Sequence, residues 1–378
     1  MLQTPQEIAE SEVVSFEDLK GLGGGEGPCV TVAVAIANPA QIRPIIHNVL
    51  DDIKKSMKEH EIRVYTDLVE PIRTLAAGIE ERGEWSKNLI LFRSPNVFRY
   101  FSLRELKKQF VTVEDRFQIR PLLGLLSRSQ RFYLLSLSQK HVRLFQCTYH
   151  SAEELGWRGL AAENMDAWMN TRQPDHVLDG RASSGPSVGS MKGVLFGTST
   201  DGEKEGEYMA HYFRHVDQAL EKLLLDRTIP LVLAGVETEI AIYRKVNRYP
   251  RLMERAVLGA PDSIPLRDLR EAAVEIVTQV PSPELRQALD QLERYSGTGR
   301  VSVAIEETLK AAWEGRVAHL IVQEDAERRG IVDDGRDRSE EDLLNRAALE
   351  TASRGGHVFA LPAAEMPANA DAVAVLRF

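Results

Sequence analysis

Ser187 lies in a sequence motif that could make it a nucleophile. Gly185-Pro-Ser-Val-Gly189 has the Gly-x-Ser-x-Gly pattern of a nucleophile elbow, in which the serine stands on a turn between a strand and a helix. Neither element is evident beside this motif, and glycine and serine are frequent in the surrounding stretch. The context favours an accidental match, and a hydrolase that uses Ser187 as its nucleophile stays open as an alternative.

Two histidines and a glutamate have spacing that could serve a metal. Glu207, His211 and His215 stand at i, i+4 and i+8, and a histidine pair one helical turn apart can bind zinc. No glutamate follows the first histidine as it does in the zincin motif, and no further cluster of ligands stands out. The spacing therefore indicates a solvated polar flank of a helix, and the sequence predicts no metal and no cofactor.

Basic residues interleaved with aromatic ones could serve RNA. Cations neutralise phosphate, and exposed aromatic rings stack on unpaired bases, although the same rings could form a core beneath a charged surface. The predicted RNA-binding residues are Lys87, Arg93, Arg99, Arg104, Lys107, Lys108, Arg116 and Arg120. The interleaved aromatic residues are Phe92, Phe98, Tyr100, Phe101, Phe110 and Phe117.

The charge distribution supports a polyanionic partner more than the net charge does. The 378-residue chain has a net charge of −9, which by itself argues against nucleic acid. Residues 81–131 contain 11 Lys/Arg against 5 Asp/Glu, a local charge of +6, whereas residues 301–378 contain 9 against 15, a local charge of −6. This polarity predicts a basic region in the N-terminal half and an acidic C-terminal end.

Bulk composition indicates a soluble protein of more than one domain. Hydrophobic residues make up 43% and charged residues 27%, as in globular proteins, and no apolar run is long enough to cross a bilayer. The first 30 residues lack the pattern of a signal peptide, and Cys29 and Cys147 lack metal-ligand spacing. We therefore expect a cytoplasmic protein with reduced thiols.

Hydrophobic periodicity predicts an α/β protein with three consecutive domains, over residues 1–120, 121–265 and 266–378. The first begins with a loose segment up to residue 29 and then has strands over 30–37, 88–92 and 97–101 and helices over 42–58 and 69–82, with mixed or parallel strands. In the last, we expect helices over 266–278, 283–295, 301–314 and 340–354, a charged loop over 324–339, and strands over 317–323, 357–361 and 372–378.

The stretch from residue 173 to 237 organises the middle of the chain. A long Gly/Ser-rich loop over 173–206 leads into an amphipathic helix and then into an apolar strand at 229–235. The predicted buried face of the helix contains Tyr208, Met209, Tyr212, Phe213, Val216, Ala219, Leu220, Leu223 and Leu224. Glu207, Arg214, Asp217, Gln218 and Glu221 are expected outside that face.

The order of these units resembles a known family. The helix and strand over 303–322, the closing strand over 372–378, and Leu231-Val-Leu-Ala-Gly235 followed by Pro250-Arg-Leu252 are similar to the bacterial archaeo-eukaryotic release factor family. This family is related to the archaeo-eukaryotic class 1 peptide-chain release factors and to Pelota. The resemblance extends over roughly residues 120–378. It implies a ribonuclease-H-like middle domain and a C-terminal domain that resembles kink-turn-binding ribosomal proteins.

The resemblance also shows what this chain lacks. The family carries a Gly-Gly-Gln loop at the start of the long helix, where it promotes hydrolysis of peptidyl-tRNA, and an Asn-Ile-Lys-Ser motif that reads codons. Neither motif occurs in this sequence. The corresponding loop position contains Asp201, Gly202, Glu203 and Gly206. Stop-codon-directed termination is therefore not expected, and peptidyl-tRNA hydrolysis is not supported.

These observations predict a ribosome-associated, release-factor-like protein that acts in ribosome rescue, stress or hibernation. The resemblance implies ribosomal RNA or tRNA as partners and a translational GTPase at the C-terminal domain, with no membrane. Two alternatives stay open. One is a hydrolase that acts on peptidyl-tRNA or RNA through the 173–206 loop, and the other is a non-catalytic scaffold that binds proteins through its acidic C-terminal domain.

Overall fold

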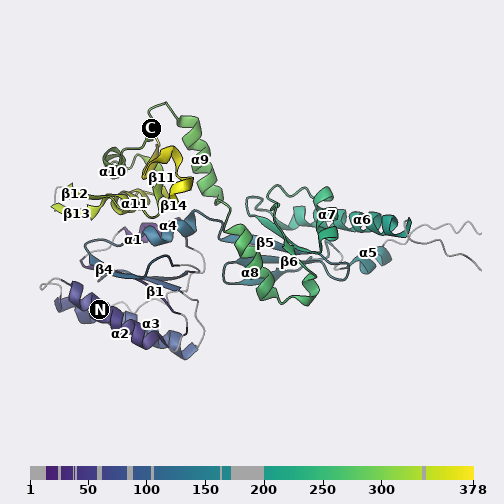
Figure 1. The fold of residues 1–378 in the computed structure, drawn as a ribbon, viewed down its shortest axis with the longest axis horizontal. Helices are drawn as coiled ribbons and strands as arrows, with labels where there is room; N and C mark the ends of the chain where they lie inside the picture. The colour runs from purple at the N-terminus through teal and green to yellow at the C-terminus, as the bar shows by residue number, and fades with distance from the viewer. Residues whose placement is uncertain are drawn as a thin grey trace, which may run out of the picture. The chain divides into compact units, whose positions relative to one another are not determined.

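The computed structural model describes residues 14–23, 27–36, 38, 41–57, 62–82, 88–103, 106–161, 164–171, 200–333 and 338–378. The chain forms two compact units. Unit 1 comprises Met1–Gln130, Thr148–His150 and Thr278–Phe378, and unit 2 comprises Arg131–Cys147 and Ser151–Val277. Both units combine helices with sheets, which confirms the predicted α/β class (Figure 1).

The first sheet of unit 1 has the strand order β3-β2-β1-β4. Its strands are β1 (Cys29–Ala35), β2 (Asn88–Arg93), β3 (Phe98–Leu103) and β4 (Phe110–Glu114), and its helices are α2 (Ile42–Ser56) and α3 (Tyr65–Arg82), with a 3-10 turn at Ile62–Val64. The paired strands around Ser94–Asn96 are confirmed. The predicted mixed or parallel arrangement is wrong, because every pairing is antiparallel. Two successive helices between β1 and β2 return the chain to the far end of the sheet, so that β2 runs opposite to β1.

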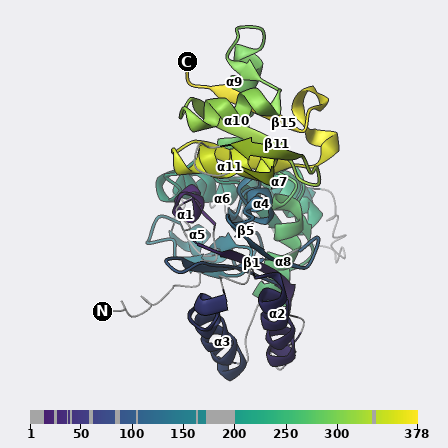
Figure 2. The ribbon, with the colours of Figure 1, turned by 90° about the vertical axis from the view of Figure 1, so that its left-hand side faces the viewer.

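Strand β1 is buried on both faces, which explains its continuous apolar run. Val30, Val32 and Val34 contribute to a core with α2 and α3 on one side. Cys29 and Ala33 belong to a second core on the other side. Figure 2 shows α2 and α3 on one side of β1, with α1 (Phe16–Leu22), α4 (Arg120–Leu126) and α11 (Leu343–Ser353) on the other.

The second sheet of unit 1 has the order β10-β15-β11-β14. Its strands are β10 (Val301–Ser302), β11 (Val317–Gln323), β14 (His357–Leu361) and β15 (Ala372–Leu376), and the helices around it are α9 (Pro283–Tyr295), α10 (Ile305–Trp313) and α11. Two 3-10 turns at Ala363–Glu365 and Pro367–Asn369 precede β15. Strand β11 runs parallel to β14 and antiparallel to β15. The predicted strands and most of the predicted helical residues are confirmed, while residues 301–302 form a short strand before α10.

Two segments of unit 1 differ from the sequence-based expectation. The predicted charged loop over 324–339 contains β12 (Arg329–Asp333), which pairs with β13 (Arg338–Asp342), so that the predicted helix over 340–354 begins only at Leu343. Residues before 29 are not only a lead-in, since α1 forms where Ser15 and Asp18 make a capping box. In both places short local hydrogen-bonding patterns override weak apolar periodicity.

One core joins the two ends of the chain within unit 1. Leu19 of α1, Ile90 of β2 and Leu122 of α4 share a buried cluster with residues beyond 300, among them Leu344 and Ala374. Polar contacts reinforce this core, because the Asn345 side chain accepts from the Ile119 amide at 3.0 Å and donates to the Phe117 carbonyl at 2.9 Å.

Unit 2 is built on a sheet with the order β7-β6-β5-β8-β9. The strands are β5 (Arg131–Ser136), β6 (Arg143–Thr148), β7 (Ala152–Leu155), β8 (Leu231–Gly235) and β9 (Val257–Leu258). The helices are α5 (Met165–Thr171), α6 (Thr200–Leu223), α7 (Glu237–Val246) and α8 (Leu266–Val277), with a 3-10 turn at Pro261–Ser263. Strands β5, β8 and β9 are parallel neighbours. Each of the three large sheets lies within one predicted domain range, and the boundaries at residues 120 and 265 stay a prediction.

Candidate functional site

The predicted loop at the family's Gly-Gly-Gln position is helical in this protein. Helix α6 begins at Thr200, so that Asp201, Gly202, Glu203 and Gly206 lie in its first two turns. The expected loop boundary at residue 206 is therefore wrong. The rest of that loop over 172–199, with Ser187, lies outside the described residues.

Helix α6 packs its predicted face onto the sheet, with two exceptions. Met209, Tyr212, Phe213, Val216, Ala219, Leu220 and Leu224 are buried, and Leu223 is half-buried. Tyr208 is 55% exposed, although the pattern assigned it to the apolar face. Asp217, predicted to lie outside the apolar face, is 1% exposed. The reason is Arg248, which covers Asp217 and donates to its carboxylate through the backbone amide at 3.1 Å and through Nε at 2.9 Å.

The polar flank of α6 has the solvated character that its spacing indicates. Glu207 and His211 are exposed, and His215 is half-buried. His211 Nδ1 lies 3.1 Å from Arg214 Nη1. Within the described parts of the chain, no group of three or more His, Cys, Asp or Glu residues could hold a metal ion.

Two members of the predicted RNA-binding set use their donors inside unit 1. Arg93 donates to the backbone carbonyls of Asp67, Leu68 and Val97 at 2.9–3.3 Å, and burial lowers its pKa. Arg120 donates to the Asp342 carboxylate at 2.8 Å and to the carbonyls of residues 323 and 324. Through these hydrogen bonds, each of the two arginines links segments of unit 1 that are distant in the sequence.

The other members of the set lie in different settings. Lys107 binds Glu324 and Asp325, and the hydrogen bond to Glu324 raises its pKa. Arg116 lies 4.0 Å from Glu341. Arg99 and Lys108 are exposed, while Lys87 and Arg104 lie outside the described residues. Among the aromatic residues, Phe92, Tyr100, Phe101 and Phe117 are buried in cores, so that they do not offer faces for stacking. A role of the set in RNA binding stays a prediction.

The carboxyl ends of the parallel strands in unit 2 bring together polar side chains that the sequence pattern did not reveal. Ser138 follows β5 and donates to Asp262 Oδ2 at 2.5 Å, and His141 Nδ1 lies 3.5 Å from Asp262 Oδ1. Glu239 of α7 is 8% exposed; burial raises its pKa, and bonds from the backbone of Val236 and Gln139 oppose that effect. This edge of an α/β sheet is where ligands commonly bind.

The geometry of this cluster does not form a nucleophilic triad. In a triad the histidine accepts the proton of the serine, whereas here Ser138 and His141 both face the same carboxylate of Asp262. A serine that donates to a carboxylate is held in place without a strong base. The cluster therefore fastens the turn at Pro261–Ser263 to the end of β5. The sequence contains no local signal for the cluster, because Asp262 is 124 residues away from Ser138.

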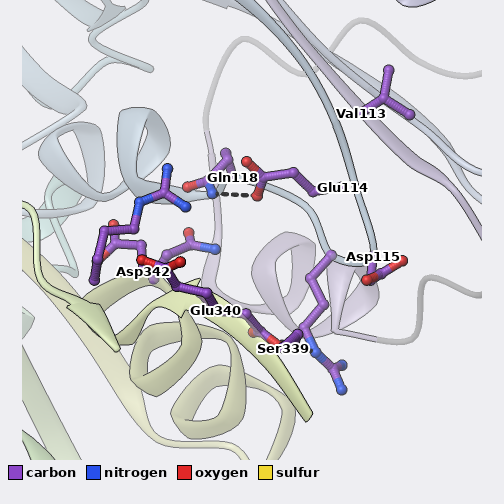
Figure 3. Close-up of a pocket in the computed structure, with 11 residues that line it drawn as sticks. Val113, Glu114, Asp115, Gln118, Ser339, Glu340 and Asp342 are labelled. Atoms are coloured by element: carbon purple, nitrogen blue, oxygen red, sulfur yellow. Dashed lines mark hydrogen bonds and ion pairs between the residues drawn. The ribbon is translucent and has the colours of Figure 1, made fainter. Parts of the chain in front are cut away.

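A polar pocket of about 210 Å³ lies in unit 1 beside β4 and β13 (Figure 3). Five carboxylates and two arginines contribute to its lining, so that acidic groups predominate. Gln118 donates to Glu114 at 2.8 Å, and Arg346 pairs with Glu341 at 3.3 Å. Glu340 is exposed at the pocket. The lining consists of Val113, Glu114, Asp115, Arg116, Gln118, Arg329, Ser339, Glu340, Glu341, Asp342 and Asn345. An excess of carboxylates can accept a guanidinium or ammonium group.

The two cysteines and the helices of the described chain bear on reactivity and on membrane insertion. Cys29 and Cys147 are free and buried, and burial raises the pKa of each thiol to about 12, which makes both unreactive. None of the helices that the structure describes combines the length and the apolar character needed to cross a membrane.

Comparison with known proteins confirms the predicted resemblance. Residues 131–316 match the model of "Bacterial archaeo-eukaryotic release factor family 3". This range contains helix α6, the sheet of unit 2 and the chain up to α10. A search of curated proteins finds no match.

Solved structures with an alignment over most of the chain include the following three. Archaeoglobus fulgidus Pelota is 13% identical over 97% of this chain and 93% of its own, with a TM-score of 0.38. An archaeal translation termination factor, aRF1, is 13% identical over 97% and 99%, with a TM-score of 0.23. Saccharomyces cerevisiae Dom34 is 9% identical over 98% and 93%, with a TM-score of 0.32. Similarities of this strength carry no inference about activity.

Proposed function

From the match of residues 131–316 to bacterial archaeo-eukaryotic release factor family 3, we propose that this protein is a ribosome-associated, release-factor-like factor. It acts in ribosome rescue or hibernation and does not terminate translation at specific codons. The observation that carries the proposal is the family match in a chain that contains no Gly-Gly-Gln.

The start of helix α6 supports binding without hydrolysis. At the family's Gly-Gly-Gln position this chain has a helical start with Asp201, Glu203 and Glu205 in its sequence. Helical backbone lacks the freedom of a glycine loop to approach crowded RNA, and acidic residues repel phosphate. Both features favour a factor that occupies a ribosomal site and leaves the peptidyl-tRNA bond intact.

The acidic pocket of unit 1 supports a protein partner at the C-terminal part of the chain. We expect a translational GTPase to present a basic side chain to Glu340 and its neighbours, because opposite charge favours the encounter of two proteins. Glu340→Lys should weaken capture of such a GTPase. Glu293→Lys, on the exposed side of α9, provides a matched control that should have no effect.

Co-sedimentation with ribosomes tests the main proposal. The purified full-length protein is centrifuged with 70S ribosomes that hold peptidyl-tRNA and a stop codon, a sense codon or no codon in the A site. We expect equal binding in all three states and no peptide release above the rate without the protein. Absence of binding in every state would refute ribosome association. Binding or release that depends on the stop codon would instead identify a codon-specific terminator.

A further inference from the structure

The amino-terminal edge of the sheet in unit 2 collects segments that are far apart in the sequence. The Tyr133 amide donates to the Pro230 carbonyl at 2.8 Å, and the Leu231 amide donates to the Arg251 carbonyl at 2.9 Å. Strand β5, strand β8 and residue 252 thus run parallel, side by side. Arg131 and Arg251 stand at the beginnings of the two outer segments, about 10 Å apart at a strand spacing of 4.7–4.9 Å.

This edge, with the adjoining ends of α6 and α7, is strongly basic. We define the basic edge by eight cations: Arg131, Lys222, Arg227, Arg244, Lys245, Arg248, Arg251 and Arg255. Four acidic residues lie on the same segments: Asp217, Glu221, Asp226 and Glu254. The excess is four positive charges, within a chain whose net charge is −9. The opposite edge of the same sheet carries Glu237, Glu239 and Asp262 together with Lys140.

Three of the four acidic side chains at the basic edge are already engaged. Asp217 and Glu221 both bind Arg248, at 2.9 Å and 3.0 Å, and Glu221 also pairs with Arg227 at 3.5 Å. Asp226 accepts from the amide and hydroxyl of Thr228. In the part of the chain that the structure describes, no ion pair engages Lys222, Lys245, Arg251 or Arg255. Lys222, Lys245 and Arg255 are exposed and Arg251 is half-buried, and these four cations can receive an external anion.

Internal hydrogen bonds hold the basic edge in shape. Arg244, in the last turn of α7, donates to the carbonyls of Met253 and Glu254. The Tyr249 hydroxyl donates to the carbonyls of Asp226 and Ile229 at 3.1 Å and 2.8 Å. Loops fixed in this way lose little conformational entropy when a ligand binds.

We infer that the basic edge of unit 2 binds the phosphate backbone of RNA, with Lys245, Arg251 and Arg255 in contact with phosphates. The inference rests on the proposed function and extends it, because it assigns the RNA contact to a surface outside the predicted set at residues 87–120. Cations on a rigid surface neutralise phosphates at any sequence, so that the contact is independent of the codon. This property suits a factor that recognises ribosomes without reading messages.

Titration of RNA into the full-length protein tests this assignment. Fluorescence anisotropy with labelled single-stranded and duplex RNA is measured over a range of KCl concentrations. The variant Lys245→Glu/Arg251→Glu should bind at least tenfold more weakly, and the slope of log K against log salt should fall by about 1.5 to 2, since each lost phosphate contact removes slightly less than 1.

The matched control is Lys140→Glu/Arg158→Glu, which makes the same change of charge at the opposite edge of unit 2. Both residues are exposed; the Lys140 amide donates to Ser138 Oγ at 3.1 Å, and Trp157, next to Arg158 in the sequence, donates to the Val142 carbonyl at 2.8 Å. The control should retain the affinity and the salt slope of the wild type. A neutral variant, Lys245→Gln/Arg251→Gln, with an unchanged thermal unfolding transition, shows that a loss of affinity does not come from misfolding. Equal loss in the control, or wild-type affinity in both edge variants, would refute the inference.

The ribosome assay separates this inference from the proposed function. If the wild type sediments with ribosomes and Lys245→Glu/Arg251→Glu does so equally well, the basic edge is not the RNA contact and the proposed function stands. If the wild type never sediments with ribosomes, the proposed function itself fails. If the edge variants bind RNA normally and lose a protein cross-link, the surface binds a protein instead of RNA, and the inference is wrong.

Discussion

Arg120 and Arg251 have different roles, and the residues next to them in the sequence do not predict this difference. Arg120 is 15% exposed at its side chain and pairs with Asp342, which is 6% exposed, so that it works as a bridge inside unit 1. Arg251, like Arg120, has a proline and a leucine close to it in the sequence, and it has no acidic partner in an ion pair among the described residues. The difference lies in whether a distant segment supplies a carboxylate. A basic residue becomes available to RNA only where the fold leaves it without one.

Two histidines in the C-terminal sheet should make stability depend on pH. His319 and His357 are register partners on β11 and β14, and the Nδ1 atoms of both have no hydrogen-bond partner in the described structure. Burial lowers the pKa of both, that of His319 to about 4, with His357 and Arg377 adding to the effect on His319. For His357, nearby Glu284 acts in the opposite direction.

The sign of the dependence follows from the lowered pKa of His319. Between pH 6.5 and about 4 the unfolded chain binds a proton at this site and the folded chain does not, so that stability falls as the pH falls. The loss should be on the order of 3 kcal/mol. Urea unfolding at pH 7 and pH 4.5 should show a smaller drop for His319→Leu than for the wild type. His47→Leu, at an exposed position of α2, should keep the wild-type drop, and equal drops in all three proteins would contradict the prediction.

At the scale of elements, the later turns of helix α6 are fixed by burial. They bury apolar residues and Asp217, and the sequence of the first two turns contains Gly202 and Gly206. Apolar periodicity located the packed part of the helix. It did not predict where the helix begins, because residues 200–207 contain no apolar repeat.

Replacement of Gly206 by alanine should stabilise unit 2. A Cβ atom at this position meets no atom within 4 Å, and alanine favours the helix over glycine by about 0.5–1 kcal/mol. The thermal unfolding transition should rise accordingly. Gly235→Ala should lower it, because the new Cβ would lie 3.1 Å from the Leu137 carbonyl oxygen in a fully buried strand. A lower transition for Gly206→Ala would show that α6 does not begin at Thr200 in solution.

At the scale of the whole molecule, the chain leaves unit 1 after Gln130 and returns to it for good at Thr278. Unit 2 has a core of its own, which includes Trp157, Trp168 and Tyr212. The main core of unit 1 needs both ends of the chain. Because unit 2 is inserted into unit 1, one continuous segment contains nearly all of unit 2, whereas unit 1 needs two separate segments in order to fold.

We predict that fragments of the chain differ in whether they unfold cooperatively. Residues 131–277 alone should unfold in one cooperative transition, with tryptophan fluorescence of the native protein. Residues 1–130 alone should lack a cooperative transition, because Leu19, Ile90 and Leu122 lose their partners beyond residue 300. Adding residues 278–378 should restore it. A cooperative transition for residues 1–120 alone would instead favour three independent domains.

Apolar periodicity and the resemblance to a release-factor family were readable from the sequence alone. They located most strands and helices, the α/β class and the family match, because local patterns of burial repeat with the period of each element. They did not reveal that the first sheet is antiparallel, that residues 329–342 pair as strands, or that α6 begins at Thr200.

Only the tertiary structure decided which charged groups are used inside the protein and which face outward. Asp217 is buried because Arg248 covers it, and Arg120 is engaged because Asp342 lies beside it. The basic edge forms because parallel strands place residues 131, 227 and 251 at one end of a sheet. A buried charge needs a partner, and the fold supplies it from 31 residues away for Asp217 and from 222 residues away for Arg120, which no local pattern records.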